Sequence, residues 1–122
     1  MKLISFFLTV ILLLGACSKQ QQENSSIKTY PRQFSSAGHE AHIFELISEA
    51  GSNSQVLVNF ANQNCGSGAA SAIGVNLDLK LEWRNHNTLV IYKQREIDLT
   101  LNPSGSRLKC FNQYVNIEVV DA

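Results

Sequence analysis

The amino-acid sequence predicts an all-β protein, a compact antiparallel β-sandwich or a curled sheet of six to seven short strands. Apolar and polar residues alternate over several short segments, and turn-forming residues separate those segments. Alternation with a period of two buries one face of a sheet and leaves the other face in water. The chain has no internal repeat and no strand–helix–strand pattern, so consecutive strands are expected to pair directly in packed layers.

The longest alternating segment, 73–84, has apolar residues at every odd position and polar or small residues at every even position. It is longer than a usual strand, so we expect a bulge or a turn near Gly74 or Asn76. The sequence Asn-His-Asn at 85–87 predicts a tight turn. This turn would pair the long segment with a strand at 88–93.

Four more short strands follow from the same alternation, and a turn at 102–105 with the sequence Asn-Pro-Ser-Gly separates two of them. These strands are predicted at residues 56–60, 97–101, 108–110 and 115–119.

Two segments have no single clear pattern. Residues 38–50 fit either a short helix that ends at Gly51 or a strand paired with residues 55–60, and we favour the strand. The glycine-rich run at 66–71 follows a strand, like a phosphate-binding loop. A phosphate-binding loop needs a helix after it, and an alternating segment follows here instead. We therefore expect a flexible loop at 66–71.

The first sixteen residues have the pattern of a signal peptide. A single basic residue, Lys2, precedes an apolar run at 3–14. A helix of that length spans only about 18 Å, whereas the hydrocarbon core of a bilayer is about 30 Å thick. The sequence therefore favours a cleaved signal over a permanent transmembrane helix.

The run ends in Leu14-Gly15-Ala16-Cys17, which resembles the lipobox of bacterial lipoproteins. That resemblance implies cleavage before Cys17 and acylation of its thiol, and two or three acyl chains give stable membrane anchoring. It also places the protein in the bacterial cell envelope. Ser18 stands where an aspartate would imply retention in the inner membrane, so the outer membrane is expected if the source is Gram-negative. The alternative is a plain secretory signal followed by a chance cysteine.

The predicted organisation is therefore a signal peptide at 1–16, a lipidated tether at 17–36 and one β-rich domain at 37–122. Removal of the signal peptide takes away one of the ten basic residues and none of the ten acidic ones. A charge balance near zero, with no basic run, excludes nucleic acid as an expected partner.

Two cysteines remain in the domain once Cys17 is lipidated. Because an exported protein lies in an oxidising compartment, Cys65 and Cys110 are expected to form a disulfide. The chain has no Cys-x-x-Cys motif, so redox chemistry is not expected.

The sequence points away from catalysis. His39-Glu40-Ala41-His42 is one residue shorter than the zinc-binding pattern His-Glu-x-x-His, and on a strand the two histidines would point to opposite faces. The serines do not lie in a nucleophile elbow. We therefore expect no catalytic residues, no metal and no cofactor. The alternative is a small metal-dependent envelope enzyme or metal-binding protein that uses His39 and His42.

The body also resembles a family of small, uncharacterised bacterial envelope proteins with a Cys-Gly motif. The segments that carry this resemblance are Val56-Leu57-Val58, Cys65-Gly66-Ser67, Leu81-Glu82-Trp83 and Leu89-Val90-Ile91-Tyr92. The family usually has threonines after Cys-Gly, where this chain has Gly68-Ala69-Ala70, and Cys110 is not a family feature. The resemblance implies a β-rich domain and no particular activity.

Together these observations predict a membrane-tethered, non-catalytic binding module. It would present a rigid β-surface to a protein or cell-wall partner in the envelope, and an inhibitor or immunity lipoprotein is one form of that role. The contacts are expected in the two loops next to the predicted disulfide. The candidate contact residues are Asn62, Asn64, Ser67, Asn102, Ser104 and Arg107.

Overall fold

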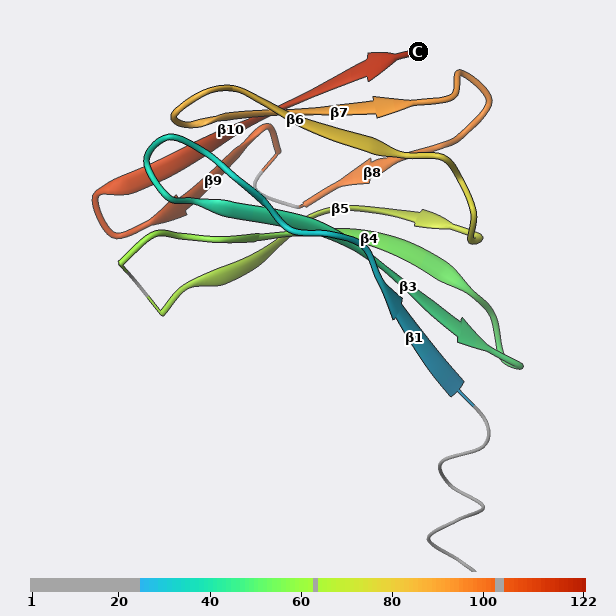
Figure 1. Ribbon diagram of the computed structural model, residues 1–122. Coiled ribbons are helices and arrows are strands. Elements are labelled where there is room, and N and C mark those ends of the chain that lie inside the picture. Colours follow the sequence, from blue (N-terminus) through green and yellow to red (C-terminus); the bar gives the residue numbers. More distant parts are fainter. Residues whose placement is uncertain (1–24, 63, 103–104) are drawn as a thin grey trace, which may run out of the picture.

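The computed structural model describes residues 25–62, 64–102 and 105–122. These residues form two β-sheets that pack face to face as a sandwich (Figure 1). The predicted all-β sandwich is therefore confirmed. The described residues contain ten strands rather than six or seven, because residues 25–29 and 33–34 of the predicted tether and the glycine-rich run at 66–71 also form strands.

The larger layer, sheet A, has six strands, all of which pair antiparallel. Its strand order is β1-β3-β4-β5-β8, and β2 pairs with β3 beyond the end of β1. The strands are β1 (Ser25–Thr29), β2 (Gln33–Phe34), β3 (Glu40–Ser48), β4 (Asn53–Asn59), β5 (Gly66–Ile73) and β8 (Thr100–Leu101).

The smaller layer, sheet B, has four strands in the order β6-β7-β10-β9. They are β6 (Lys80–Asn85), β7 (Thr88–Lys93), β9 (Arg107–Cys110) and β10 (Gln113–Asp121). β7 and β10 are parallel, so sheet B is mixed where the sequence predicted antiparallel pairing throughout. After β7 the chain crosses to sheet A and forms β8. It then crosses back to sheet B, where β10 runs parallel to β7.

The hydrophobic core lies between the inner faces of the two sheets. Sheet A contributes small and β-branched side chains, and sheet B contributes larger aliphatic ones. Fully buried members include Ala41, Val56, Val58 and Ala69 from sheet A, and Leu89, Ile91 and Val115 from sheet B.

The alternating segment 73–84 was predicted to be strand with a bulge or a turn near Gly74 or Asn76, and the break in the segment begins at Gly74. β5 ends at Ile73, β6 begins at Lys80, and the residues between them form a connection. Its polar positions have left-handed backbone: φ is +105° at Gly74, 55° at Asn76 and 56° at Asp78. Glycine, asparagine and aspartate tolerate that conformation best, so the alternation here reflects successive turns rather than a pleat.

The glycine-rich run at 66–71 was predicted to be a loop, and it is part of strand β5 instead. β5 pairs with β4 along its length, with one irregularity where Val56 lies opposite Ala70 and Leu57 opposite Gly68. The extra residue, Ala69, is fully buried. The extra residue forms a β-bulge, and its small side chain fits beneath sheet B.

Two other predictions concern the start of the domain. Residues 38–50 contain strand β3, as favoured, and no helix. The predicted tether extended to residue 36, but β1 and β2 place residues 25–29 and 33–34 in sheet A. The domain therefore begins by Ser25. The predicted signal peptide and Cys17 lie outside the described residues.

Candidate functional site

The sandwich has two distinct ends. β1 begins at one end, beside the turn between β3 and β4, and the connections β4–β5 and β9–β10 lie at the other end (Figure 1). We call the second end the disulfide end, because it contains the bond between Cys65 and Cys110.

The disulfide joins the two sheets, and it confirms the predicted pairing. Cys65 directly precedes β5 and Cys110 is the last residue of β9, with their Cα atoms 6.2 Å apart. A second link lies near the opposite edge, where Trp83 Nε1 donates a hydrogen bond to the Gln33 carbonyl oxygen at 3.0 Å. The disulfide end is therefore held to both layers of the sandwich.

Phe111 is the most exposed aromatic residue at the disulfide end. It directly follows Cys110, its backbone has φ of 54°, and its side chain is 76% exposed. A bulky residue rarely adopts left-handed backbone, and such strain persists only where the surroundings enforce it. The disulfide and the β9–β10 turn enforce it here and hold the ring out toward solvent.

The predicted contact residues spread around this end. Asn62, with φ of 59°, and Asn64 are exposed in the β4–β5 connection. Arg107 is exposed on β9, where its guanidinium lies 4.7 Å from the Tyr114 ring centroid and its Nε donates to Asn116 Oδ1 at 3.2 Å. A side chain held by such contacts, as Arg107 is, loses little conformational entropy when it binds a partner.

Two other predicted contact residues are tied to the edge of sheet A. Asn102 donates its backbone N–H to the Ala69 carbonyl oxygen at 2.9 Å and its side-chain amide to the Gly68 carbonyl oxygen. Ser67 is half-buried on β5. Ser104 lies outside the described residues. Four of the six predicted residues therefore surround or approach the disulfide end, while Ser67 is half-buried on β5.

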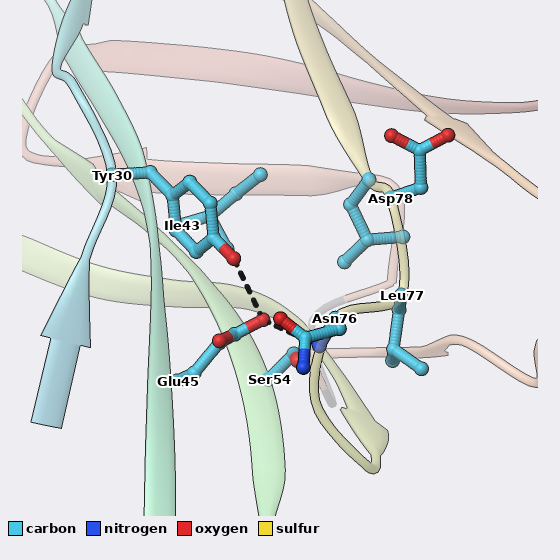
Figure 2. Close-up of a pocket in the computed structure, with 8 residues that line it drawn as sticks. Tyr30, Ile43, Glu45, Ser54, Asn76, Leu77 and Asp78 are labelled. Atoms are coloured by element: carbon cyan, nitrogen blue, oxygen red, sulfur yellow. Dashed lines mark hydrogen bonds between the residues drawn. The ribbon is translucent and has the colours of Figure 1, made fainter. Parts of the chain in front are cut away.

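A cavity of about 250 Å³ lies between the sheets at the end where β1 begins (Figure 2). Its floor holds Glu45, which is only 2% exposed. Glu45 Oε2 accepts hydrogen bonds from the Tyr30 hydroxyl at 2.9 Å and from the Asn76 backbone N–H at 2.7 Å. A buried carboxylate is tolerated only when such donors replace its water.

Through its hydrogen bond to the Asn76 backbone, Glu45 fixes the left-handed connection between β5 and β6 against β3. Asn76 belongs to that connection, and Gly74 is held at its start by hydrogen bonds to Ser52 and Ser54. The Lys28 ammonium lies 5.0 Å from the Tyr30 ring centroid, on the solvent side of the same group. The arrangement explains the burial of Glu45 without a ligand.

A shallow groove runs along β5 on the side of sheet A that faces away from sheet B. Its two parts, of about 560 and 280 Å³, share Gln55, Ser71 and Thr100. The wider part is bordered by Ile73 and by the acidic residues Glu96 and Asp98. The groove exists because the small residues of β5 leave its surface low between β4 and β8.

The two histidines do not form a shared metal site. His39 packs its ring edge against Phe60, with centroids 5.4 Å apart, and its Nδ1 accepts the Ala61 backbone N–H at 3.1 Å. His42 lies on the outer face of β3, where its Nδ1 is 3.7 Å from Glu40 Oε1. Across the described part of the chain, no three histidine, cysteine, aspartate or glutamate residues are grouped to hold a metal ion.

Among the described residues, three groups have clearly shifted pKa values, and each shift has a structural cause. Burial, with a smaller contribution from His86, lowers the pKa of His39 below its ordinary value of 6.5. The hydrogen bond to Glu82 raises the pKa of Tyr92, and the hydrogen bond to Lys93 lowers the pKa of Asp121. All three groups are in structural contacts.

Comparison with family models, with curated proteins and with solved structures finds no match for this chain. The resemblance to the Cys-Gly envelope family therefore stays a prediction from its motifs. In residues 25–62, 64–102 and 105–122, no helix is long and apolar enough to cross a membrane.

Sequence reasoning missed Glu45 and Phe111. Glu45 occupies a core-facing position after Ala41 and Ile43, and this break in the apolar alternation of β3 was the available signal. Phe111 carried no signal, because its exposure follows from a left-handed turn that a phenylalanine rarely occupies.

Proposed function

We propose that this protein is a membrane-anchored lipoprotein of the bacterial envelope that acts as a non-catalytic binding module. Lipidation at Cys17 holds it to the membrane, and the disulfide end contacts a protein partner. An inhibitor or immunity role toward an envelope-targeting enzyme is one specific form of this function. The lipobox supports the anchoring, and the geometry of the disulfide end supports the binding role.

The observation that carries the binding role is Phe111. Exposed aromatic side chains in rigid surroundings are frequent anchors of protein interfaces, because they bury a large area at a small entropic cost. Phe111 is 76% exposed and directly follows the disulfide-bonded Cys110. The amides of Asn62 and Asn64 on the facing loop supply polar groups for the rim of such a contact.

The non-catalytic part of the proposal rests on how Glu45, His39 and Tyr92 are used. Glu45 holds a backbone connection, His39 accepts a backbone N–H, and Tyr92 donates to Glu82. A group already satisfied by structural hydrogen bonds is poorly placed to exchange protons with a substrate.

Two measurements test this function. Mass analysis of the protein from bacterial membranes should show cleavage before Cys17 and acylation, both of which Cys17→Ser abolishes. A photo-crosslinking amino acid at position 111 should then give one discrete adduct in intact envelopes, and the same amino acid at Glu82 on sheet B should not. Equal labelling at both positions would contradict a partner site at the disulfide end.

Binding to an identified crosslinked partner gives the quantitative test. Phe111→Gly removes the ring while allowing left-handed backbone, so it separates loss of contact from loss of folding. We expect at least a tenfold loss of affinity, that is about 1.4 kcal/mol or more. Unchanged affinity would remove Phe111 as the anchor.

A further inference from the structure

The outer face of sheet A, which is turned away from sheet B, carries three strongly exposed hydrophobic side chains. Ile27 is 66% exposed, Phe34 is 63% exposed and Ile73 is 92% exposed. Three more apolar residues on this face, Phe44, Leu46 and Leu57, are half-buried between them. The strand register places all six outward, and we call them the apolar face.

The apolar face also has very little charge. Among the described strands of sheet A, Glu40 is the one charged residue that points outward, and Arg32 Nε lies 3.1 Å from its Oε1. Antiparallel sheets usually present polar side chains to water on the face that does not pack on a core. A surface with several exposed apolar groups and few charges is typical of contact with another protein or with a membrane.

The position of the predicted lipid anchor decides between these two occupants. Ser25, the first residue of β1, is the eighth residue after Cys17. A fully extended chain of that length spans at most about 28 Å. Five neighbouring strands measure about 20 Å across. A domain held at Cys17 therefore stays within roughly its own width of the bilayer, and β1 belongs to the sheet with the apolar face.

We propose that the apolar face lies against the membrane surface, with Ile27, Phe34 and Ile73 at the boundary between headgroups and acyl chains. This inference rests on the proposed lipidation, because a short tether makes docking on the bilayer an intramolecular event with a high effective concentration. Apolar side chains on one flat face then add their burial to the binding energy of the acyl chains. Sheet B faces the aqueous compartment, and the disulfide end stays accessible at the side.

The groove along β5 indicates which lipid surface fits. Glu96 and Asp98 border it next to Ile73, and they would repel an anionic surface. Amide and hydroxyl groups of Gln55, Ser71 and Thr100 lie in the same groove and can hydrogen-bond to phosphate oxygens. The chemistry therefore favours zwitterionic headgroups, which carry an ammonium group beside the phosphate.

The test uses the full-length, lipidated protein reconstituted into phosphatidylcholine vesicles. Ile73→Cys introduces a thiol for a fluorescent label on the apolar face, and Lys109→Cys places the same label on the outer face of sheet B as the matched control. Lipids that carry a nitroxide should quench the label at position 73 several-fold more strongly than the label at position 109. The opposite order is expected for an aqueous quencher.

A second experiment introduces a charge into the apolar face. Ile27→Glu should reduce lipid quenching of the label at position 73 several-fold, whereas Tyr114→Glu on the outer face of sheet B should leave it unchanged. Replacing part of the phosphatidylcholine by phosphatidylglycerol should not strengthen the quenching. A clear increase would contradict the assignment to a zwitterionic surface.

The outcomes separate this inference from the proposed function. A protein that fails to float with the vesicles, or that lacks acyl chains at Cys17, refutes the lipoprotein proposal itself. A protein that floats but shows equal quenching at positions 73 and 109 refutes only the docking of the apolar face. Protection of position 73 that appears only at high protein density would assign the face to a second copy of the chain and would also overturn the inference.

Discussion

Apolar side chains on the two outer faces of the sandwich differ in how far they are exposed to solvent. Val90 points outward from the centre of sheet B and is only 1% exposed, whereas Ile73 points outward from sheet A and is 92% exposed. Val90 lies between Glu82 and Glu118 in the strand register, and the side chains around it are paired with one another. Tyr92 donates to Glu82, and Arg84 forms an ion pair with Glu118.

This difference shows that exposure of apolar residues is a property of their neighbours as much as of the strand pattern. Long charged and aromatic side chains cover a valine on sheet B with their stems and rings. On sheet A, Asn53 lies opposite Ile73 and Ser71 is the next outward residue along β5, and both side chains are too short to cover an isoleucine.

The largest expected effect concerns the link that holds the two sheets together. The disulfide closes a loop with a sequence separation of 45 residues. The chain-entropy model assigns about 4 kcal/mol to such a loop. The double variant Cys65→Ser/Cys110→Ser should lose roughly that much free energy of unfolding in urea titrations. Equal stability of the reduced and oxidised forms would show that packing alone joins the sheets.

The next effect concerns the inner face of sheet A. Glu45→Ala removes the acceptor of two hydrogen bonds and leaves the Tyr30 hydroxyl and the Asn76 N–H without it. We expect a loss of about 2–3 kcal/mol in the free energy of unfolding. Glu49→Ala, in the exposed turn after β3, is the matched control and should change stability by less than about 0.5 kcal/mol.

Burial of His39 makes the free energy of unfolding depend on pH. Because the pKa of His39 in the folded protein lies below 6.5, the unfolded chain binds a proton first as the pH falls. The stability is therefore complete above pH 6.5 and decreases as the pH falls below that value. His39→Asn keeps an acceptor for the Ala61 N–H and should flatten this decrease in urea midpoints measured between acidic and neutral pH. The control variant His42→Asn should lose stability at acidic pH as the wild type does.

A smaller effect is expected on the charged outer face of sheet B. Arg84 and Glu118 are about half-exposed, so their pairing should contribute no more than about 1 kcal/mol. Arg84→Ser should lower the unfolding midpoint slightly, and added salt should reduce the difference from the wild type. A large loss that persists in high salt would mean that Arg84 acts mainly by covering Val90.

The smallest effect on folding is expected at the most exposed position. Ile73→Ser should change the free energy of unfolding by less than about 0.5 kcal/mol, because the side chain gains little burial when the chain folds. Thermal and urea unfolding of the two proteins should coincide. Marked destabilisation would show that Ile73 supports the fold and would weaken its interpretation as a contact residue.

Much of the fold could be predicted because strands that pack on a core keep a strict alternation. The segments around Val56, Val90 and Val115 and the turn at 85–87 lie where the sequence predicted them. The pairing of Cys65 with Cys110 followed from elimination, since Cys17 was assigned to lipidation. These features depend on local pattern or on counting, which a single sequence supplies.

Other parts depend on pairing between distant segments, which a single sequence does not reveal. β5 is rich in glycine, serine and alanine, a composition typical of loops, and it becomes a strand because β4 pairs with it along its length. β1 lies in a polar segment and is held by β3. The exposed ring of Phe111 could not be predicted, because the handedness of its turn decides the direction of the side chain.

The place of β10 in sheet B has a consequence for how the protein is made. This final strand lies in the middle of its sheet, between β7 and β9, so it supplies hydrogen bonds to both. Until residues 113–121 are available to pair, sheet B lacks the strand that joins β7 to β9. Pairings between segments so far apart along the chain also form slowly. The sandwich should therefore be completed in a single late step, after residues 113–121 have been synthesised.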